Sequence, residues 1–220
     1  PNWSFKNVLP YFKKLETWSG GENLYRGGKG PLKVNRSKID ERFPLFNSLI
    51  KAAAEAGYNT FEDSNGFKQD GFGTFDVTID GGKRQSVARA YLEEVKNFKN
   101  LIIKHKIDVS KIIFKDKKAI GVEVKNNNKT EIYHCNKEII LSAGSINSPK
   151  ILQLSGVGEP KLLMQNNIEV IHELPGVGQN LQDHLEIYIQ HKSKTKDTLY
   201  NLSTNYFTQA IEGMKWFLLK

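Results

Sequence analysis

The run from Ile139 to Gly158 constrains the fold of this chain more than any other segment. Residues 138–142 make a short apolar stretch of the kind that is buried as a strand in a parallel sheet. Three residues with almost no side chain follow, namely Ala143, Gly144 and Ser145. Apolar residues at helical spacing come next. We therefore expect a buried strand, a tight turn and a helix in immediate succession.

The expected helix has clear end signals. Ser148 is placed as its N-cap and Pro149 as its first residue, where proline loses no needed donor, and Gly156 or Gly158 ends it. Exposed N–H groups at such a helix start, beside a turn that a flat ligand can approach, suit a nucleotide. The alternative is that the small residues only let helix and sheet pack closely. The residues by themselves leave both interpretations open.

The other segments predict a mixed α/β chain. Glycine, asparagine and aspartate clusters mark the turns, among them Asp63–Gly66 and the glycine-rich loop 20–31. Lone Cys135 provides neither a disulfide framework nor a multi-cysteine metal site. Helices are expected at 3–16, at 42–57 with Gly57 as the stop, and after Ser86 as N-cap, and strands at 71–79, 101–104, 107–114, 119–125 and 130–135, with turns at 116–118 and 126–128.

Composition excludes several classes of protein. With 39% hydrophobic residues among 220, the chain has the composition of an ordinary globular protein. No run approaches the roughly 20 apolar residues of a transmembrane helix. The net charge of +8 comes from lysines scattered along the whole chain, not gathered into a stripe. We therefore expect no nucleic-acid partner, although a basic binding module is the non-enzymatic alternative.

The run Ile139–Gly158 resembles the second signature of the glucose–methanol–choline (GMC) oxidoreductase family. The matching pieces are Gly144-Ser145, Ser148-Pro149, Ile151-Leu152 and Ser155-Gly156-Val157-Gly158. Further landmarks occur in family order, at residues 9–14, 28–32, 82–92 and 174–184. The resemblance covers essentially the whole chain and is closest to choline-oxidising members of the family.

The resemblance implies an α/β (α+β) fold with FAD as cofactor. A Rossmann-like FAD-binding domain with a β-meander would be joined to part of an antiparallel-sheet substrate domain. The implied division is a linker helix and glycine-rich loop at 1–33, part of the substrate or cap region at 34–92, a portion of the FAD domain at 93–184, and the start of the substrate-binding domain at 185–220.

The family pattern also implies roles for single residues. Val109 would offer its backbone to the adenine, and the alternative is a plain strand residue. Ala143 and Gly144 would lie against the adenine–ribose or pyrophosphate region, and Asn180 near the cofactor. Asp183 and His184 would be structural hydrogen-bonding residues there.

Glu186 would face the trimethylammonium group of choline, because a carboxylate can attract a cation that has no hydrogen to donate. Tyr188 would share its strand face. A solvated strand glutamate is the alternative. Leu185 stands where the family's oxidases carry proline.

The chain is expected to be an internal piece of a longer protein. The phosphate-binding glycine loop is expected before Pro1, and the catalytic histidine with its histidine or asparagine partner after Lys220. The intact protein is expected to oxidise choline to betaine aldehyde, alternatively a neutral alcohol; a truncated non-catalytic product is the other possibility. We expect a homo-oligomer, cytoplasmic or peripheral on the inner membrane, with an electron acceptor that the sequence does not identify.

Overall fold

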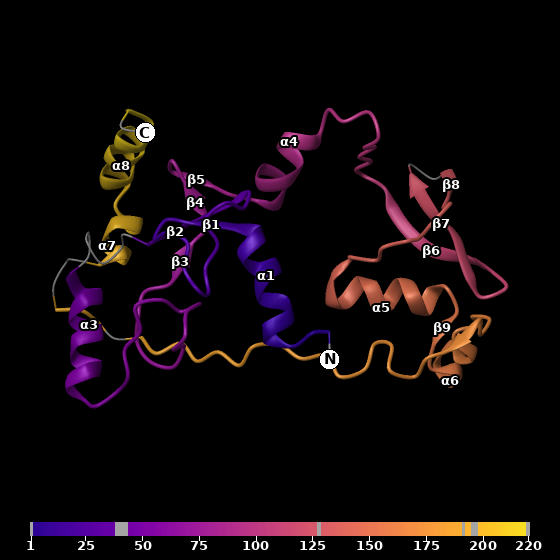
Figure 1. Cartoon of the computed structure of the whole chain (residues 1–220), viewed down its shortest axis with the longest axis horizontal. Helices are drawn as coiled ribbons and strands as arrows, with labels where there is room; N and C mark the ends of the chain where they lie inside the picture. The colour runs from indigo at the N-terminus through magenta and orange to yellow at the C-terminus, as the bar shows by residue number, and fades with distance from the viewer. Residues whose placement is uncertain (1, 38–43, 127–128, 191, 195–197, 219–220) are drawn as a thin grey trace. The chain divides into compact units, whose positions relative to one another are not determined.

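The computed structural model describes residues 2–37, 44–126, 129–190, 192–194 and 198–218. The chain divides into two compact units (Figure 1). Unit 1 comprises Pro1–Leu101 and Gln190–Lys220, and unit 2 comprises Ile102–Ile189. No helix in the described ranges is long and apolar enough to cross a membrane.

The helices of unit 1 confirm the predicted periodicity. Gly57 has φ +87° two residues after the end of α3, which confirms it as the stop, while predicted residues 42 and 43 lie outside the described residues. Ser86 Oγ accepts the Arg89 N–H at 3.3 Å, which confirms the predicted N-cap. The helices are α1 (Phe5–Leu15), α3 (Pro44–Glu55), the π-helical η1 (Ala88–Leu92) continuing into α4 (Glu93–Val95), α7 (Leu199–Thr204) and α8 (Tyr206–Leu218).

The strands of unit 1 are short. β1 (Glu16–Trp18) pairs in parallel with β2 (Leu32–Arg36), and β2 pairs antiparallel with β3 (Asp76–Val77). β4 (Ile79–Asp80) and β5 (Lys83–Arg84) form a small hairpin. The predicted strand 71–79 was therefore wrong for most of its length. Its alternating aromatic residues serve ring contacts instead, because Phe72 packs on Tyr58 and Phe75 on Phe61.

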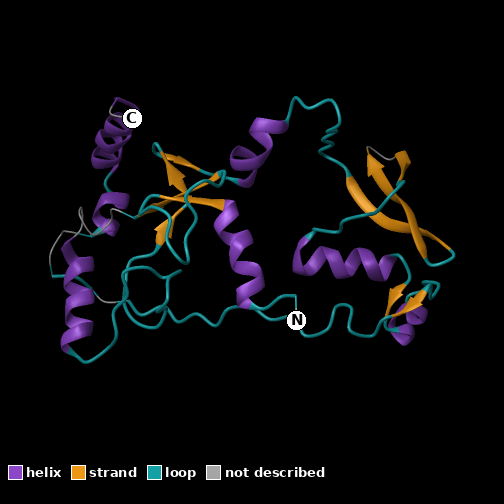
Figure 2. Cartoon of the chain, viewed as in Figure 1, coloured by secondary structure: helices purple, strands orange, loops and turns teal. Residues whose placement is uncertain are grey.

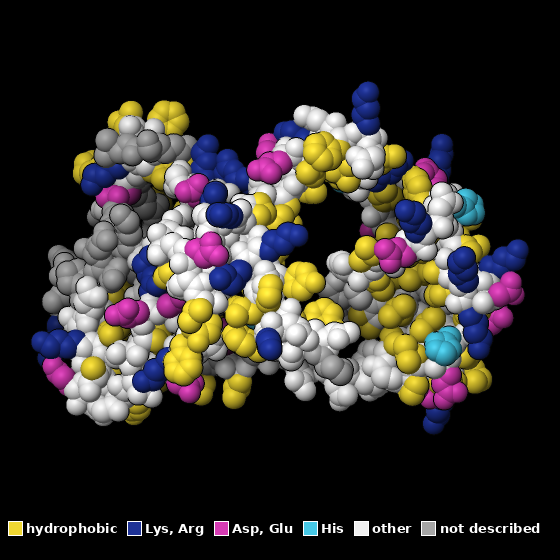
Figure 3. Space-filling view, in the orientation of Figure 1, with side chains coloured by type: hydrophobic (Ala, Val, Ile, Leu, Met, Phe, Trp, Pro, Cys, Tyr) yellow, Lys and Arg dark blue, Asp and Glu magenta, His cyan; other side chains and the backbone are white. Residues whose placement is uncertain are grey.

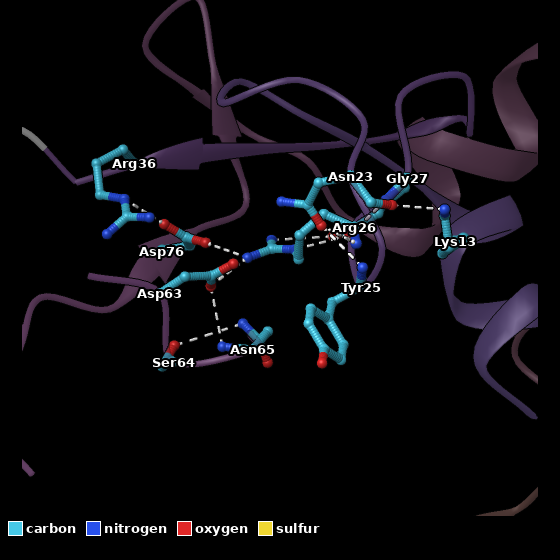
Figure 4. Close-up of polar contacts among 11 residues, drawn as sticks. Lys13, Asn23, Tyr25, Arg26, Gly27, Arg36, Asp63, Ser64, Asn65 and Asp76 are labelled. Atoms are coloured by element: carbon cyan, nitrogen blue, oxygen red, sulfur yellow. Dashed lines mark hydrogen bonds and ion pairs between the residues drawn. The ribbon is translucent and has the colours of Figure 1, made fainter. Parts of the chain in front are cut away.

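A buried arginine organises unit 1. Arg26 is only 1% exposed, and its guanidinium contacts three carboxylates. Its Nε and Nη2 reach Glu16 at 2.8 and 3.1 Å. Its Nη1 reaches Asp63 at 2.6 Å and Asp76 at 2.8 Å (Figure 4). The ring of Trp18 lies 4.5 Å from the guanidinium carbon. One side chain therefore ties together β1, the glycine-rich loop, the Asp63–Gly66 turn and β3.

The predicted turn at Asp63 is confirmed by the Gly66 N–H, which donates to the Asp63 carbonyl at 3.1 Å.

The meander predicted for unit 2 is confirmed. β6 (Asp108–Lys115), β7 (Lys118–Asn126) and β8 (Lys129–His134) form an antiparallel sheet in the order β6-β7-β8. The β6–β7 turn places Asp116 and Lys117 at positive φ, whereas Asn127 and Asn128 of the next predicted turn lie outside the described residues. No strand forms at 101–104, so that prediction was wrong.

Helix α5 (Gly144–Leu154) packs beside β6 (Figure 1). It begins five residues earlier than the sequence suggested, so Ser148 is not the N-cap and Pro149 lies inside the helix. The Ser148 hydroxyl accepts the Ala143 N–H at 3.0 Å, which secures the first turn from within. Gly156, with φ +81°, follows the helix end as predicted.

The remaining elements of unit 2 follow α5. β9 (Val157–Gly158) pairs in parallel with β10 (His172–Glu173), and α6 (Pro160–Gln165) lies between them in sequence. From Leu174 to Ile189 the chain is loop (Figure 2).

The predicted buried strand at 138–142 is not formed, and Ile140 is 78% exposed. A parallel strand forms only when neighbouring strands bond to it, and in the described part of the chain none lies there. Many other large hydrophobic side chains are also uncovered (Figure 3).

Candidate functional site

A cavity of about 720 Å³ lies between helix α5 and the start of strand β6. The N-cap Ala143 and one face of α5 line it, and the helix contributes Asn147, Ile151 and Leu154 at helical spacing. Residues 107–111 line the opposite side. Its volume lies within the range of small-molecule sites in proteins, about 300–1,000 Å³.

The β6 side of the cavity contains a β-bulge. Val109 pairs with Val124 and Lys111 with Glu123, so Ser110 is an extra residue without a partner. Such bulges bend a strand and are frequent beside functional sites. Val109 itself is 43% exposed and lines the cavity.

The α5 side is built from small residues. Ala143 lines the cavity, and Gly144 follows it with φ +85°, a conformation that disfavours residues other than glycine. A side chain at Gly144 would project into open space, with nothing within 4 Å of it. The backbone at the start of α5 can therefore be approached closely from outside.

A buried hydroxyl joins the two walls. The Ile112 N–H of β6 donates to Ser155 Oγ at 2.7 Å, and the same hydroxyl donates to the Ile151 carbonyl of α5 at 2.5 Å. Ser155 is 7% exposed. This buried hydroxyl therefore acts both as a hydrogen-bond acceptor and as a donor, as is usual for hydroxyls inside proteins.

A second cavity, about 270 Å³, lies on another face of α5. Ser145, Pro149 and Gln153 line it together with Gly178, Gln179 and Leu181 of the following loop. Gln153 Nε2 donates to the Val177 carbonyl at 3.2 Å and holds that loop to the helix. Asn180, with φ +54°, lies in this loop.

Val109 and Ala143 are therefore brought together in one cavity, with Gly144 adjacent. Asn180 is not, because its loop follows a different face of α5. Lys150 is the residue that lines both cavities.

Glu186 lies further along the loop and lines neither of these two cavities. The Tyr188 hydroxyl donates a hydrogen bond to Glu186 Oε2, so the two side chains share one side of the segment although no strand forms there. This hydrogen bond raises the pKa of Tyr188 above its ordinary value. Asp183 and His184 are exposed, and the His184 N–H donates to Asp183 Oδ1 at 2.8 Å.

Sequence reasoning did not single out two features of this site. The bulge at Ser110 has no residue pattern of its own. Ser155 was noted only as part of a family signature, although a lone serine between an apolar helix and a glycine stop is a signal for a buried hydrogen bond.

A family model described as GMC oxidoreductase matches residues 1–186. The chain belongs to the GMC oxidoreductase family. Two relatives named oxygen-dependent choline dehydrogenase are 42% identical in Photobacterium profundum and 45% identical in Escherichia coli, over 99% and 98% of this chain. The chain spans 38% and 39% of the length of these two proteins.

Solved structures agree with the family assignment. An FAD-dependent oxidoreductase from Chaetomium thermophilum superposes with a TM-score of 0.85 and 33% identity, covering 100% of this GMC chain and 40% of that protein. The expected fold class, a Rossmann-like α/β oxidoreductase fold with a β-meander, is confirmed by this likeness together with the β6–β8 sheet.

Proposed function

We propose that the chain provides the adenine side of an FAD site in an alcohol oxidoreductase. The observation that carries the proposal is the cavity in which Val109 and Ala143, far apart in sequence, line opposite walls. Membership of the GMC family and an FAD-dependent structural neighbour support FAD as the occupant.

The residues present suit an adenosine group. Val109 and Ile151 offer apolar surface for a flat base, and the bulge at Ser110 interrupts the backbone pairing beside it. Ala143 and Gly144 leave room at the helix start, where N–H groups favour oxygen-rich ligands. Asn180 lies in the loop that lines the second cavity, and it would contact the cofactor from that face of α5. FAD, when bound, accepts the hydride that leaves the alcohol carbon.

Choline is the proposed substrate of the intact protein, with betaine aldehyde as product. The support is the name of the two relatives and the pair formed by Glu186 and Tyr188. The Glu186 carboxylate would attract the quaternary ammonium by charge, and the Tyr188 ring would add an aromatic face. No residue of this chain is assigned as the base, and the homo-oligomeric state and cellular location stay predictions.

Ala143→Leu tests the cofactor site. Ala143 is exposed and its backbone accepts any residue, so the variant is expected to fold while its side chain fills the cavity. In the intact protein it should weaken FAD binding by about tenfold or more, measured by flavin fluorescence. Lys161→Leu, exposed on α6 and outside both cavities, is the control. Equal FAD affinity in both variants would contradict the proposal.

Glu186→Gln tests the substrate. The variant should raise the KM for choline by about tenfold or more while leaving the KM of the neutral carbon analogue, with a tert-butyl group in place of trimethylammonium, nearly unchanged. An equal effect on the two alcohols, or no effect on choline, would point to a neutral alcohol instead.

A further inference from the structure

We propose that Ser155 is a positioning residue for the cofactor: its hydroxyl fixes helix α5 against strand β6 and thereby sets the width of the cavity between them. This inference rests on the proposed role of that cavity in binding FAD. It gives a defined task to a side chain that touches neither substrate nor cofactor in the proposed function.

Among the described residues, strand β6 has another strand on one side only. It is the edge strand of the sheet β6-β7-β8, and an edge strand has N–H groups that no neighbouring strand can pair. The N–H of Ile112 is one of these groups, and Ile112 is only 7% exposed. Water cannot easily satisfy it there, so Ser155 Oγ, at 2.7 Å, is its partner.

The same hydroxyl is also bonded to helix α5. The Ser155 hydroxyl donates its hydrogen bond to the Ile151 carbonyl at 2.5 Å. Because the proton is held there, the lone pairs of the oxygen are oriented toward β6. In the ranges of the chain that the structure describes, the Ile112–Ser155 contact is the one hydrogen bond that joins α5 to β6. The remaining contact between the two elements is packing.

The residues next to this bond line the cavity. Lys111 and Leu154 line the cavity, and their chain neighbours Ile112 and Ser155 make the bond. The bond therefore lies where the two walls meet. Ala143 lies twelve residues along α5 from Ser155, about 18 Å at the rise of a helix. A rotation of α5 by about 5° at this end would move Ala143 by about 1.5 Å relative to Val109.

The test separates positioning from a merely structural role. Ser155→Ala in the intact apoprotein removes the acceptor and leaves the Ile112 N–H buried without a partner. Leu163→Ala is the matched control, because Leu163 is 1% exposed in α6 of the same unit and lines neither cavity, and its truncation should cost at least as much stability. The readouts are the Kd for FAD from flavin fluorescence and the Tm of the apoprotein.

Ser155→Ala should raise the Kd for FAD about tenfold, and Leu163→Ala less than about twofold, although both lower the Tm. Ser155→Cys, which keeps the volume but is a weak acceptor, should fall between wild type and Ser155→Ala, and it provides the measurement if the alanine variant does not fold. The inference is overturned if FAD affinity falls only in proportion to Tm across these variants, or if Ser155→Ala and Ser155→Cys bind FAD as wild type does. A wild-type protein that binds no FAD would instead overturn the proposed function itself, and this inference with it.

Discussion

Tyr188 and Glu186 illustrate how two residues on an unpaired segment can already be organised. Their side chains point to the same side because they are two positions apart on an extended backbone. The hydrogen bond from the phenol to Glu186 Oε2 orients the carboxylate and places an aromatic ring next to it. Both features would serve the recognition of a quaternary ammonium group.

This contact predicts the titration of Tyr188. The phenol loses its hydrogen bond to Glu186 when it ionises, and desolvation also disfavours the charged form, so the pKa of Tyr188 is raised above its ordinary value. The stabilisation of the folded chain by this hydrogen bond is therefore fully present below the ordinary pKa of tyrosine, and it is lost as the pH rises through the raised pKa of Tyr188. Glu186→Gln should return the pKa of Tyr188 toward its ordinary value. The ultraviolet phenolate signal, taken as the difference from Tyr188→Phe, measures it, and an unchanged pKa in Glu186→Gln would refute the contact.

In unit 1, Arg26 is the centre of a buried cluster of charged side chains. Burial by itself lowers its pKa, but the hydrogen bonds to Glu16 and Asp76 and the nearby carboxylate charges outweigh this and raise the pKa above its ordinary value, so the side chain stays charged. Arg26→Met would leave Glu16, Asp63 and Asp76 close together, with an ion pair from Arg36 to Asp76 at 3.0 Å still in place.

We therefore expect Arg26→Met to lower the free energy of unfolding by about 3–5 kcal/mol, the usual cost of breaking a buried ion cluster. Urea unfolding of the intact protein measures this loss. Arg84→Met, at an exposed position of β5, is the control and should change stability by less than about 0.5 kcal/mol. Equal losses in the two variants would show that the cluster contributes no special stability.

At the scale of elements, α5 is bounded by two glycines with different reasons for being glycine. Gly144 and Gly156 both have positive φ, but a Cβ at Gly144 meets nothing, whereas at Gly156 it would lie 2.4 Å from the Glu169 carbonyl oxygen. Gly144→Ala should therefore cost about 1–2 kcal/mol, the penalty of the left-handed conformation alone. Gly156→Ala should cost clearly more, because the backbone at Glu169 and Ile171 must also shift. Thermal unfolding of both variants compares the losses, and an equal Tm would contradict the geometry.

The elements also show what local sequence can and cannot predict. The meander could be predicted because its strands and turns are specified by neighbouring residues, such as the pair Asp116–Lys117. The start of α5 could not, because Ser148-Pro149 has the pattern of a helix start, yet Ser148 accepts the Ala143 N–H from inside the helix. The strand at 138–142 depends on partner strands, so its apolar composition by itself does not fold it.

The candidate site also combines residues that the sequence could predict with contacts that it could not. Val109 and Ala143 were identified through family resemblance, and the structure brings them to one cavity. The bulge at Ser110 and the bond from Ile112 to Ser155 depend on the register between distant segments. No single stretch of sequence contains that information.

At the scale of the whole molecule, the chain matches only part of the length of its relatives and has much apolar surface uncovered. It spans 38–39% of its choline dehydrogenase relatives, and apolar side chains such as Ile140 and Leu185 are 78% and 94% exposed. Large exposed apolar surface is normally covered by other parts of a protein. The activity proposed here therefore belongs to the intact protein, in which this chain would supply one wall of the cofactor site and Glu186.

The most direct test is the flavin spectrum of the intact protein under nitrogen. The purified protein should show oxidised FAD, and choline should bleach it fully because the alcohol's hydride passes to the cofactor. The tert-butyl analogue at the same concentration should bleach it far more slowly. A protein without flavin, or one whose flavin stays oxidised with choline while the neutral analogue reduces it, would contradict the account.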